Sequence, residues 1–350
     1  MSSDRAKAYT NAGVNIQAGS ELVDRIRHYV ASTRIRGVIS DIGGFGGLFR
    51  PELSGINEPV LVSSTDGVGT KLKLAFAFNK HDSVGIDLVA MSANDILVHG
   101  AHPLFFLDYF ATGRLDVEIA QTVVGGIAEG CRQAGCALLG GETAEMPDMY
   151  APGEYDLAGF CVGIADNTRL IDGSGIQVGD KIIGIASSGL HSNGFSLVRE
   201  ILADSGLSAD EPFPGADGAS TKDVLLTPTT IYVTPVRALL RDMNIKGMAH
   251  ITGGSFYDNL PRVLPAQVEA RIFFDAWPIP PVFTWLKKMG NLSWPEMFQI
   301  FNCGIGYILL TSVEQAKEAV NRMQSFGMSA SIIGEIARHS QDEEQVVINF

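Results

Sequence analysis

The chain has 350 residues, of which 46% are hydrophobic and 19% charged, so it is long enough for two domains and apolar enough to bury a core. Its formal net charge of -13 argues against sequence-independent binding to nucleic acid or to an anionic membrane surface. A phosphorylated ligand is compatible with this charge, because carboxylates can recruit Mg²⁺ and so invert the local sign.

The N-terminus and the cysteines favour a cytoplasmic protein. Residues 1–15 are polar and lack the apolar core of a signal sequence, and no apolar run reaches the roughly 20 residues that span a bilayer. The cysteines form no Cys-x-x-Cys pair and are too few for a disulfide framework. We expect reduced and mostly buried thiols at Cys131, Cys136, Cys161 and Cys303.

Apolar runs predict alternating strands and helices in the first half of the chain. The predicted strands are residues 60–65, 104–112, 137–139 and 157–165. Helical spacing of apolar residues predicts a helix over 86–99 and a second one whose N-cap is Asp116. This second helix contains Gly125 and Gly126, although glycine is unfavourable inside helices.

A polar, glycine-rich stretch at 166–179 separates the two halves, and we place a domain boundary there, between residues 1–168 and 169–350. The second half is expected to contain a strand at 181–186, a loop at 205–230, a helix opened by a capping box of Thr311 and Glu314 and stopped at Gly327, and a strand at 331–337. The alternation predicts two α/β or α+β domains.

Two glycine-containing segments in the first half are candidate phosphate sites. In SSTDGVGTK, residues 63–71, the glycines allow backbone N–H groups to approach phosphate oxygens, Asp66 can hold Mg²⁺, and Lys71 can meet negative charge. Taken alone, this segment is explained better by a solvated turn between a strand and a helix. The loop DIGGFGG, residues 41–47, is either a flap over nucleotide phosphates or a flexible surface loop.

Three further acids are candidate metal ligands. Asp87 and Asp95 recur near helical spacing, and an acid buried in an apolar pattern must be paired or bound to a metal. The alternative is that both acids are exposed, which suits Asp95 less because apolar residues follow it. Glu142 follows Gly140-Gly141 at the end of an apolar run, so we expect its carboxylate at a tight turn near backbone donors.

Two segments in the second half place a histidine and small donors at glycine-rich turns, namely SSGLHSNG at 187–194 and HITGGSF at 250–256. A turn of this kind before a helix is a ready anion site, which makes His191 a candidate ligand. NCGIG at 302–306 is weaker and is explained equally by close backbone packing. The chain has neither a Gly-x-Ser-x-Gly elbow nor a His-Glu-x-x-His motif, so its recurring glycines, hydroxyls and isolated carboxylates favour phosphoryl chemistry.

Taken together, these segments resemble the phosphoribosylformylglycinamidine cyclo-ligase family, the aminoimidazole ribonucleotide synthetases of purine biosynthesis. The resemblance runs from Tyr9 to Ile336. The matching stretches are YTNAGVNIQAG, DIGGFGG, SSTDGVGTK, DLVAMSANDILVHGA, GGETAEMPDMY, SSGLHSNGFSLVR, PTTIYV, HITGGSFYDNLPR and FNCGIG. Ser255, Thr234 and Tyr307 depart from the family pattern, where glycine, lysine and methionine are common.

The resemblance implies an enzyme that uses ATP to close the ring of formylglycinamidine ribonucleotide, giving aminoimidazole ribonucleotide, ADP and phosphate. The γ-phosphoryl group would go to the formyl amide oxygen, and the amidine nitrogen would then attack that carbon and expel phosphate. This chemistry needs positioning and charge neutralisation more than covalent catalysis. Two alternatives stay open: a related ATP-dependent kinase or phosphoryl-activating ligase, and a silent nucleotide-binding protein.

With this resemblance we expect two cofactors, ATP and Mg²⁺. The expected metal ligands are Asp66, Asp95 and Glu142, which would hold ATP through Mg²⁺, and the further nucleotide contacts are Lys71, Gly43, Gly44 and Gly46. The expected catalytic residues are His191, His250 and Asp66. The expected substrate-binding residues are Ser192, Asn193, Thr252 and Gly253.

The resemblance also implies an α/β (α+β) fold of two domains. The N-terminal domain would bind ATP and dimerise, with its strands forming a barrel across a homodimer, and the C-terminal domain would be a mixed α/β unit. ATP would lie near the dimer interface. The expected partners are a small-molecule substrate and a second copy of the chain, with neither nucleic acid nor a membrane.

Overall fold

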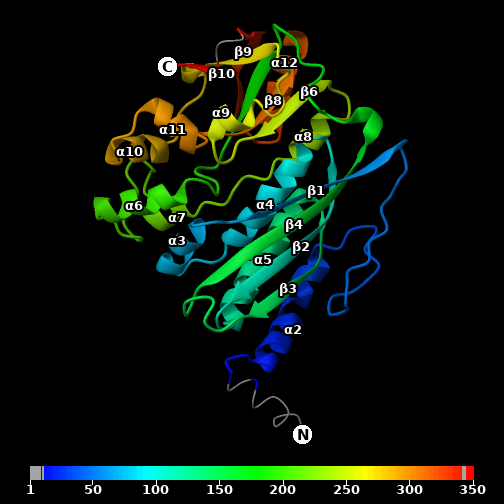
Figure 1. The fold of residues 1–350 in the computed structure, drawn as a ribbon, viewed down its shortest axis with the longest axis vertical. Helices are drawn as coiled ribbons and strands as arrows, with labels where there is room; N and C mark the ends of the chain where they lie inside the picture. Colours follow the sequence, from blue (N-terminus) through cyan, green and yellow to red (C-terminus); the bar gives the residue numbers. More distant parts are fainter. Residues whose placement is uncertain (1–8, 10–11, 341–343) are drawn as a thin grey trace.

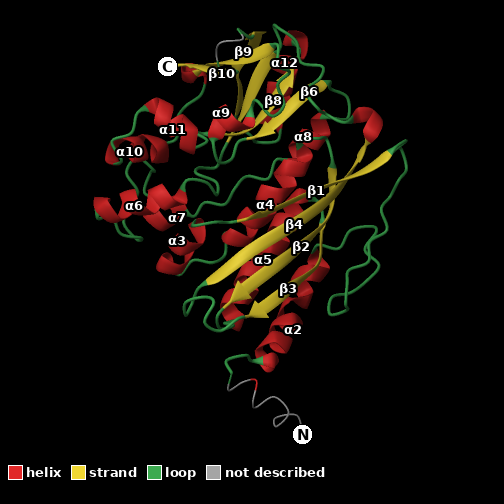
Figure 2. Ribbon diagram, viewed as in Figure 1, coloured by secondary structure: helices red, strands yellow, loops and turns green. Residues whose placement is uncertain are grey.

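The computed structural model describes residue 9 and residues 12–340 and 344–350, which form two β-sheets with helices packed against them (Figures 1 and 2). Most of the N-terminal segment for which the sequence predicts no signal sequence, residues 1–8 and 10–11, lies outside the described residues. Within the described part of the chain, no helix is both long and apolar enough to cross a membrane. All four cysteines are free and buried, which confirms the expected thiols.

The first sheet has the strand order β1-β4-β2-β3. Its strands are β1 (Pro59–Gly67), β2 (His102–Thr112), β3 (Ala137–Glu145) and β4 (Tyr155–Asp166). Strand β4 is antiparallel to β1 and β2, whereas β3 is parallel to β2. The four predicted strands are confirmed, but the expected tight turn at Gly140-Gly141 is wrong because β3 continues to Glu145.

Helices cover one face of this sheet (Figure 2). They are α2 (Ile16–Ser32), α4 (Val84–Leu97) and α5 (Val117–Ala134), and α3 (Lys71–Phe78) packs against α4 beside them. The two predicted helices are confirmed as α4 and α5, and the Asp116 carboxylate accepts the backbone N–H groups of Glu118 and Ile119. Glycines are needed where α4 and α5 cross, because a Cβ atom at Gly85 would lie 2.3 Å from the Val123 carbonyl oxygen.

The second sheet has the strand order β10-β7-β9-β5-β8-β6. Its strands are β5 (Lys181–Ala186), β6 (Ile245–His250), β7 (Val268–Phe273), β8 (Ile305–Thr311), β9 (Ala330–Arg338) and β10 (Val346–Asn349). Strands β5 and β6 are both antiparallel to β8. Their C-terminal ends and the beginning of β8 therefore share one edge of the sheet. The sequence predicts only β5 and β9 among these six strands.

The remaining helices surround the second sheet and reach toward the first. They are α6 (Phe195–Ser205), α7 (Thr221–Leu225), α8 (Val233–Leu239), α9 (Ser255–Asn259), α10 (Pro281–Met289), α11 (Trp294–Ile300) and α12 (Val313–Ser325), with 3-10 turns at Asn167–Arg169 and Phe274–Ala276. The segment predicted as a loop at 205–230 thus contains α7.

The predicted capping box of Thr311 and Glu314 is wrong. The N-cap of α12 is Ser312, and the Thr311 hydroxyl instead donates to the carbonyl oxygen of Asn244 at 2.9 Å. The predicted end of this helix is confirmed, because Gly327 follows it with a φ of 77°.

The fold is a mixed α/β one with two sheets joined by residues 167–180, a connection that includes the boundary predicted from the sequence. Over the described residues the first sheet is open, with β1 and β3 at its two edges, and does not close into a barrel.

Candidate functional site

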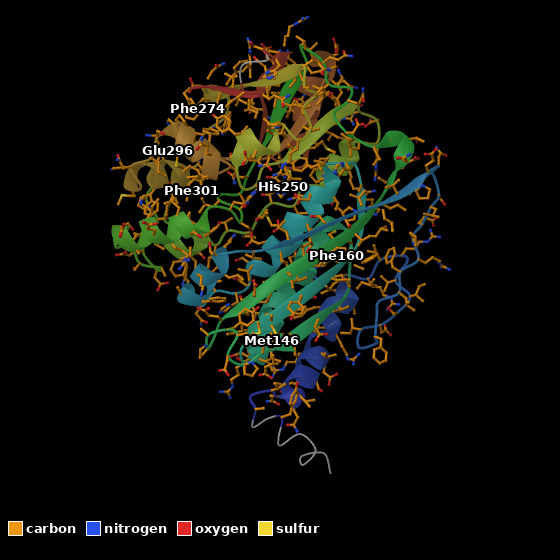
Figure 3. All side chains as sticks on the ribbon, viewed as in Figure 1. Met146, Phe160, His250, Phe274, Glu296 and Phe301 are labelled. Atoms are coloured by element: carbon orange, nitrogen blue, oxygen red, sulfur yellow. The ribbon has the colours of Figure 1, made fainter. Side chains whose placement is uncertain are left out.

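The candidate site is a cleft between the two sheets, lined by residues from both halves of the chain. The cleft has a volume of about 320 Å³. Its polar lining includes Ser64 and Asp95 from the first half and His250, Asn259 and Arg262 from the second. Figure 3 shows His250 at this junction, beside the end of α4. An acid, an imidazole and a guanidinium in one cleft can bind a cation and an anion together.

Asp95 and His250 form the centre of the cleft. His250 Nδ1 lies 2.8 Å from Asp95 Oδ1, and the Ser64 hydroxyl donates to Asp95 Oδ2 at 3.2 Å. The Asn94 amide orientation is fixed because Nδ2 donates to the Thr230 carbonyl oxygen and Oδ1 accepts the N–H of Tyr232.

Asn94 also indicates the tautomer of His250. Its Nδ2 lies 3.5 Å from His250 Nε2, so Nε2 faces a donor and serves as the acceptor. In this tautomer Nδ1 carries a proton and points at the Asp95 carboxylate. Asp95 orients this histidine in the same way that carboxylates orient catalytic imidazoles.

Asp66 adjoins this centre from strand β1. Burial raises the pKa of its carboxyl above the ordinary value, and the neighbouring Asp95 charge adds to the increase. The N–H of Gly67 donates to Asp66 Oδ1 at 2.7 Å and His250 lies nearby, which partly offset that increase. Two neighbouring carboxylates that repel each other suit a bound divalent cation.

Glu142 does not join Asp66 and Asp95 within one chain. Asp66, Gly159, Asp108 and Gly141 form one row across the sheet, and Gly67, Ala158, Tyr109 and Glu142 form the next. Successive rows point to opposite faces of a sheet. A Cβ atom at Gly159 would meet Leu88 of α4, so the Asp66 row faces the helices and Glu142 faces the open side. The expected set of three metal ligands is therefore not assembled in a single chain.

The glycine-rich loop also lies away from Asp66. A Cβ atom at Gly47 would be 2.4 Å from the Leu139 side chain, so the loop packs against edge strand β3, whereas Asp66 is on the opposite edge strand β1. Gly43 and Gly46 have open space around them, and the Phe45 side chain is fully exposed. In one chain, Gly43, Gly44 and Gly46 are a surface loop outside the cleft.

Lys71 has a different environment from the one expected for an ATP contact. Its ammonium is fully buried and donates to Asp87 Oδ1 at 2.9 Å, to the His191 carbonyl oxygen at 2.9 Å and to the Thr227 carbonyl oxygen at 2.8 Å. Because these three acceptors use all three of its protons, Lys71 has none left for a phosphate. Asp87 also accepts both the N–H and the hydroxyl of Thr229, so this pair joins the two halves of the chain.

His191 is buried rather than presented to the cleft. Its Nε2 accepts the backbone N–H groups of Ser188 and Thr230, at 3.2 and 3.5 Å. Burial lowers the pKa of the ring far below its usual value, and the neighbouring side chains of His250 and Lys71 lower it further. The ring is therefore neutral and holds its own loop in place, with a left-handed backbone at φ 60°. Direct contact between His191 and a substrate requires the loop to move.

The expected substrate-binding residues come from two loops that face each other. Asn193 lies beside Gly253, since a Cβ atom on that glycine would be 3.3 Å from Asn193 Oδ1. The Thr252 hydroxyl donates to Asn259 Oδ1 at 3.2 Å, which ties the second loop to α9. The Ser192 hydroxyl donates to Asp87 at 3.1 Å, so it helps to join the two halves.

Three residues in or beside the cleft have no role in the sequence-based assignment. Asn259 and Arg262 follow the HITGGSF segment and line the cleft, and Asn94 precedes Asp95 in α4. The sequence signal that could have indicated a role for Asn94 was its position next to Asp95, a candidate acid. Its function depends on contacts with Thr230 and His250, more than 130 positions away in the chain, which periodicity does not reveal.

The residues present fit a magnesium ion that is held partly by a nucleotide. Among the described residues, no cluster of three or more His, Cys, Asp or Glu side chains forms a metal site on its own. Mg²⁺ usually keeps several waters and takes one or two carboxylates together with substrate phosphates. The neighbouring carboxylates of Asp66 and Asp95 meet that requirement without Glu142.

Comparison with known proteins identifies the family. Residues 54–165 match the model of the AIR synthase related protein, N-terminal domain, and residues 177–347 match its C-terminal domain. A protein of Oleidesulfovibrio alaskensis named phosphoribosylformylglycinamidine cyclo-ligase is 67% identical over 351 residues, with 100% of each chain covered. Proteins of the same name from Nitratidesulfovibrio vulgaris and Lawsonia intracellularis are 66% and 60% identical, also over 100% of each chain.

Two solved structures share the fold at low sequence identity. Thiamine-monophosphate kinase from Stenotrophomonas maltophilia has a TM-score of 0.69 and 18% identity, covering 94% of this chain and 95% of its own. Hydrogenase maturation protein HypE in complex with ATP has a TM-score of 0.67 and 17% identity, covering 97% and 93%. The identities of 60 to 67% over the full length of the chain, in contrast, show that this chain belongs to the phosphoribosylformylglycinamidine cyclo-ligase family.

Proposed function

We propose that this chain catalyses the ATP-dependent ring closure of formylglycinamidine ribonucleotide to aminoimidazole ribonucleotide in purine biosynthesis. The observation that carries the proposal is identity of 60 to 67% over the full length of relatives named as this cyclo-ligase. The cleft supports it, because Asp66 and Asp95 suit a magnesium–nucleotide complex and Arg262 suits an anionic substrate.

The reaction proceeds by activation of a poor leaving group. The bond between the β,γ-bridging oxygen and the γ-phosphorus of ATP breaks, and a bond forms from that phosphorus to the formyl amide oxygen. The amidine nitrogen then attacks the activated carbon and loses a proton, and the carbon–oxygen bond breaks to release phosphate. Bound Mg²⁺ would neutralise charge on the phosphates, with Asp66 and Asp95 as its protein ligands.

His250 is the residue placed to move a proton. Its Nδ1 proton is held by Asp95, which leaves Nε2 as an acceptor beside Asn94. An imidazole oriented in this way can accept, at Nε2, the proton that the amidine nitrogen loses once the Asn94 amide, 3.5 Å from Nε2, has moved aside. His191 acts as a positioning residue in the closed loop, with Ser192 and Asn193 beside it and Thr252 and Gly253 opposite.

The open face of the first sheet supports a homodimer. Leu61, Tyr109 and Phe160 are 66%, 39% and 41% exposed on that face, and β1 and β3 leave two unpaired edges. Pairing with a second copy would cover the apolar face and close the strands into a barrel. Glu142 lies on the open face, and the loop with Gly43, Gly44 and Gly46 lies at the β3 edge. A dimer would bring these residues to a nucleotide bound near its interface.

A coupled assay tests the proposed reaction. Purified protein with Mg-ATP and formylglycinamidine ribonucleotide should give ADP, free phosphate and diazotisable aminoimidazole in equal amounts, with none formed without Mg²⁺. ADP together with a phosphorylated small molecule and no aminoimidazole would contradict the cyclo-ligase and indicate a kinase. ATP binding without turnover would indicate a silent nucleotide-binding protein.

A further inference from the structure

A second cavity lies next to the cleft and has a different character. Its volume is about 590 Å³, and it shares two lining residues, Ile171 and Asp172, with the cleft. Four cations line it, and we call it the arginine pocket after them: Arg169, Arg237, Arg241 and Lys246. None of the residues assigned to the proposed reaction lines this cavity.

Two of the four cations have partners. Lys246 Nζ donates to both carboxylate oxygens of Asp180, at 2.7 and 2.8 Å. Arg169 Nε lies 3.8 Å from Asp166 Oδ2, although its own side chain is largely exposed. The acid Asp166 also accepts backbone N–H groups, and Asp172 accepts the N–H and hydroxyl of Ser174. Asp166 and Asp172 keep their negative charge, but they take their hydrogen bonds from residues close to them and form none with Arg237 or Arg241.

Arg237 and Arg241 are the uncompensated pair. Among the described residues, neither guanidinium forms an ion pair or a hydrogen bond within the chain. They are four residues apart, at the end of α8 and just beyond it, where like charges destabilise each other. Arg237 is half-buried, and burial lowers its pKa, with the Arg241 charge as a second cause. A half-buried, unpaired guanidinium is costly unless an anion neutralises it.

The side of Arg237 that faces strand β2 offers no compensating charge. His102 lies there, and its buried Nδ1 has no hydrogen-bond partner among the described residues. Burial, with Arg237 as a further cause, lowers the pKa of His102 to about 4, so this ring is neutral at neutral pH. Both the half-buried Arg237 and the exposed Arg241 line the cavity, where an anion could meet their positive charge.

We propose that the arginine pocket binds the phosphate group of a nucleoside monophosphate, with Arg237 and Arg241 as its phosphate ligands. The planar guanidinium fork matches phosphate oxygens, and a dianion would relieve the repulsion between the two arginines. Leu170, Leu240 and Met243 give the pocket an apolar wall for the nucleoside, and the volume lies in the range of small-molecule sites. This site is separate from the Asp66–Asp95–His250 cleft, and the proposal does not rest on the cyclo-ligase reaction.

Calorimetric titration of the full-length protein with AMP, and separately with inorganic phosphate, tests the site. Arg237→Met and Arg241→Met should each weaken AMP binding about 10-fold, because each removes charge-assisted hydrogen bonds. Arg338→Met, which removes an exposed arginine at the end of β9, is the matched control and should leave AMP affinity unchanged. Thermal melts followed by circular dichroism verify that each variant is folded.

The cleft provides the decisive comparison. Arg262→Met, in the cleft, should retain AMP binding at the arginine pocket. Loss of AMP binding in Arg262→Met together with full binding in Arg237→Met and Arg241→Met would overturn the proposal, as would an absence of AMP binding to the unmodified protein. Inorganic phosphate that binds as tightly as AMP would contradict the nucleoside part, because the apolar wall would then contribute nothing.

Discussion

Lys71 and Asp87 show how a single buried ion pair holds the two halves of this chain together. Both side chains are fully buried, and their oppositely charged atoms lie 2.8 Å apart. The second half supplies further partners, through the carbonyl oxygens of His191 and Thr227, which accept from Lys71, and through Thr229, which donates to Asp87 Oδ1. Because charge burial is costly, the pair stabilises the fold only while every one of these contacts is made.

Removing one member of this pair should be far more damaging than removing an exposed one on the same helix. We expect Lys71→Met to lower the free energy of unfolding by about 3–5 kcal/mol, since it leaves a buried, unpaired carboxylate. Lys73→Met is the control, because the Lys73–Glu154 pair is 43% and 31% exposed and should contribute less than about 1 kcal/mol. Urea unfolding measures both, and equal losses would contradict the structural role of Lys71.

Replacing Asp66 by asparagine should raise the stability of the metal-free protein at neutral pH and weaken metal binding. Its pKa is raised, so the folded protein binds this proton more tightly, and stability falls as pH rises from the unfolded-state value of 3.8 through the raised folded-state value. We therefore expect Asp66→Asn to be more stable than the unmodified protein at neutral pH without Mg²⁺, and equally stable at pH values below both pKa values. Thermal melts across this pH range measure the difference.

The same variant should lose the effect of the metal. Mg-ATP should raise the melting temperature of the unmodified protein by mass action but raise that of Asp66→Asn much less, and ring closure should fall about 100-fold or more. Glu142→Gln should reduce the Mg²⁺ dependence only if the partner copy completes the site. An Asp66→Asn variant that cyclises at the unmodified rate would refute the metal role of Asp66.

At the scale of elements, glycine determines how closely α4 and α5 pack. A Cβ atom at Gly85 would lie 2.3 Å from the Val123 carbonyl oxygen and 2.4 Å from the Ile127 nitrogen. Both are backbone atoms of the facing helix, so the clash cannot be relieved by a rotamer change. The glycines cost helix propensity in isolation, and the close helix contact compensates for that cost.

Two glycine-to-alanine variants in helices should therefore change stability in opposite directions. Gly85→Ala should lower the free energy of unfolding by about 1–3 kcal/mol, because α4 and α5 must move apart. Gly19→Ala, in α2, has open space around the new methyl group and should raise it by up to about 1 kcal/mol. Chemical denaturation compares the two, and a stabilised Gly85→Ala variant would show that the helices do not pack as described.

At the scale of the whole molecule, the first sheet has two unlike faces. The face toward α4 and α5 is buried, whereas the open face exposes Leu61, Tyr109 and Phe160. Figure 3 shows Phe160 on the sheet, away from the helices. An exposed apolar patch on an open sheet is typical of an interaction surface.

A charge placed on this face should separate the proposed dimer. Phe160→Asp should shift the protein from dimer to monomer in sedimentation equilibrium, because a carboxylate would be desolvated at the interface. Phe326→Asp, at the end of α12, replaces a side chain that is 47% exposed and should leave the mass unchanged. If the unmodified protein is a monomer, the proposed dimer is wrong, and so is the proposal that dimerisation brings Glu142 near the nucleotide.

Local sequence patterns predicted the helix boundaries that single residues determine. Asp116 caps α5 with its carboxylate, and Gly327 ends α12 with a left-handed backbone, so both boundaries could be read from single residues. Strands β6 and β8 could not be predicted in this way. They are buried on both faces, so their sequences lack the alternation of apolar and polar residues that marks a half-exposed strand. The continuation of β3 through Gly140-Gly141 depends on pairing with β2, which the glycines do not encode.

The sequence by itself determined the family, the two-domain α/β character and the candidates Asp66, Asp95 and His250, because motif order along the chain and residue chemistry are one-dimensional properties. Only the tertiary structure decided which candidates meet. Strand pairing and pleat put Glu142 on the opposite face from Asp66, and burial gave Lys71 and His191 internal partners. Side-chain direction and desolvation arise from contacts between residues far apart in the chain, so these assignments required the folded molecule.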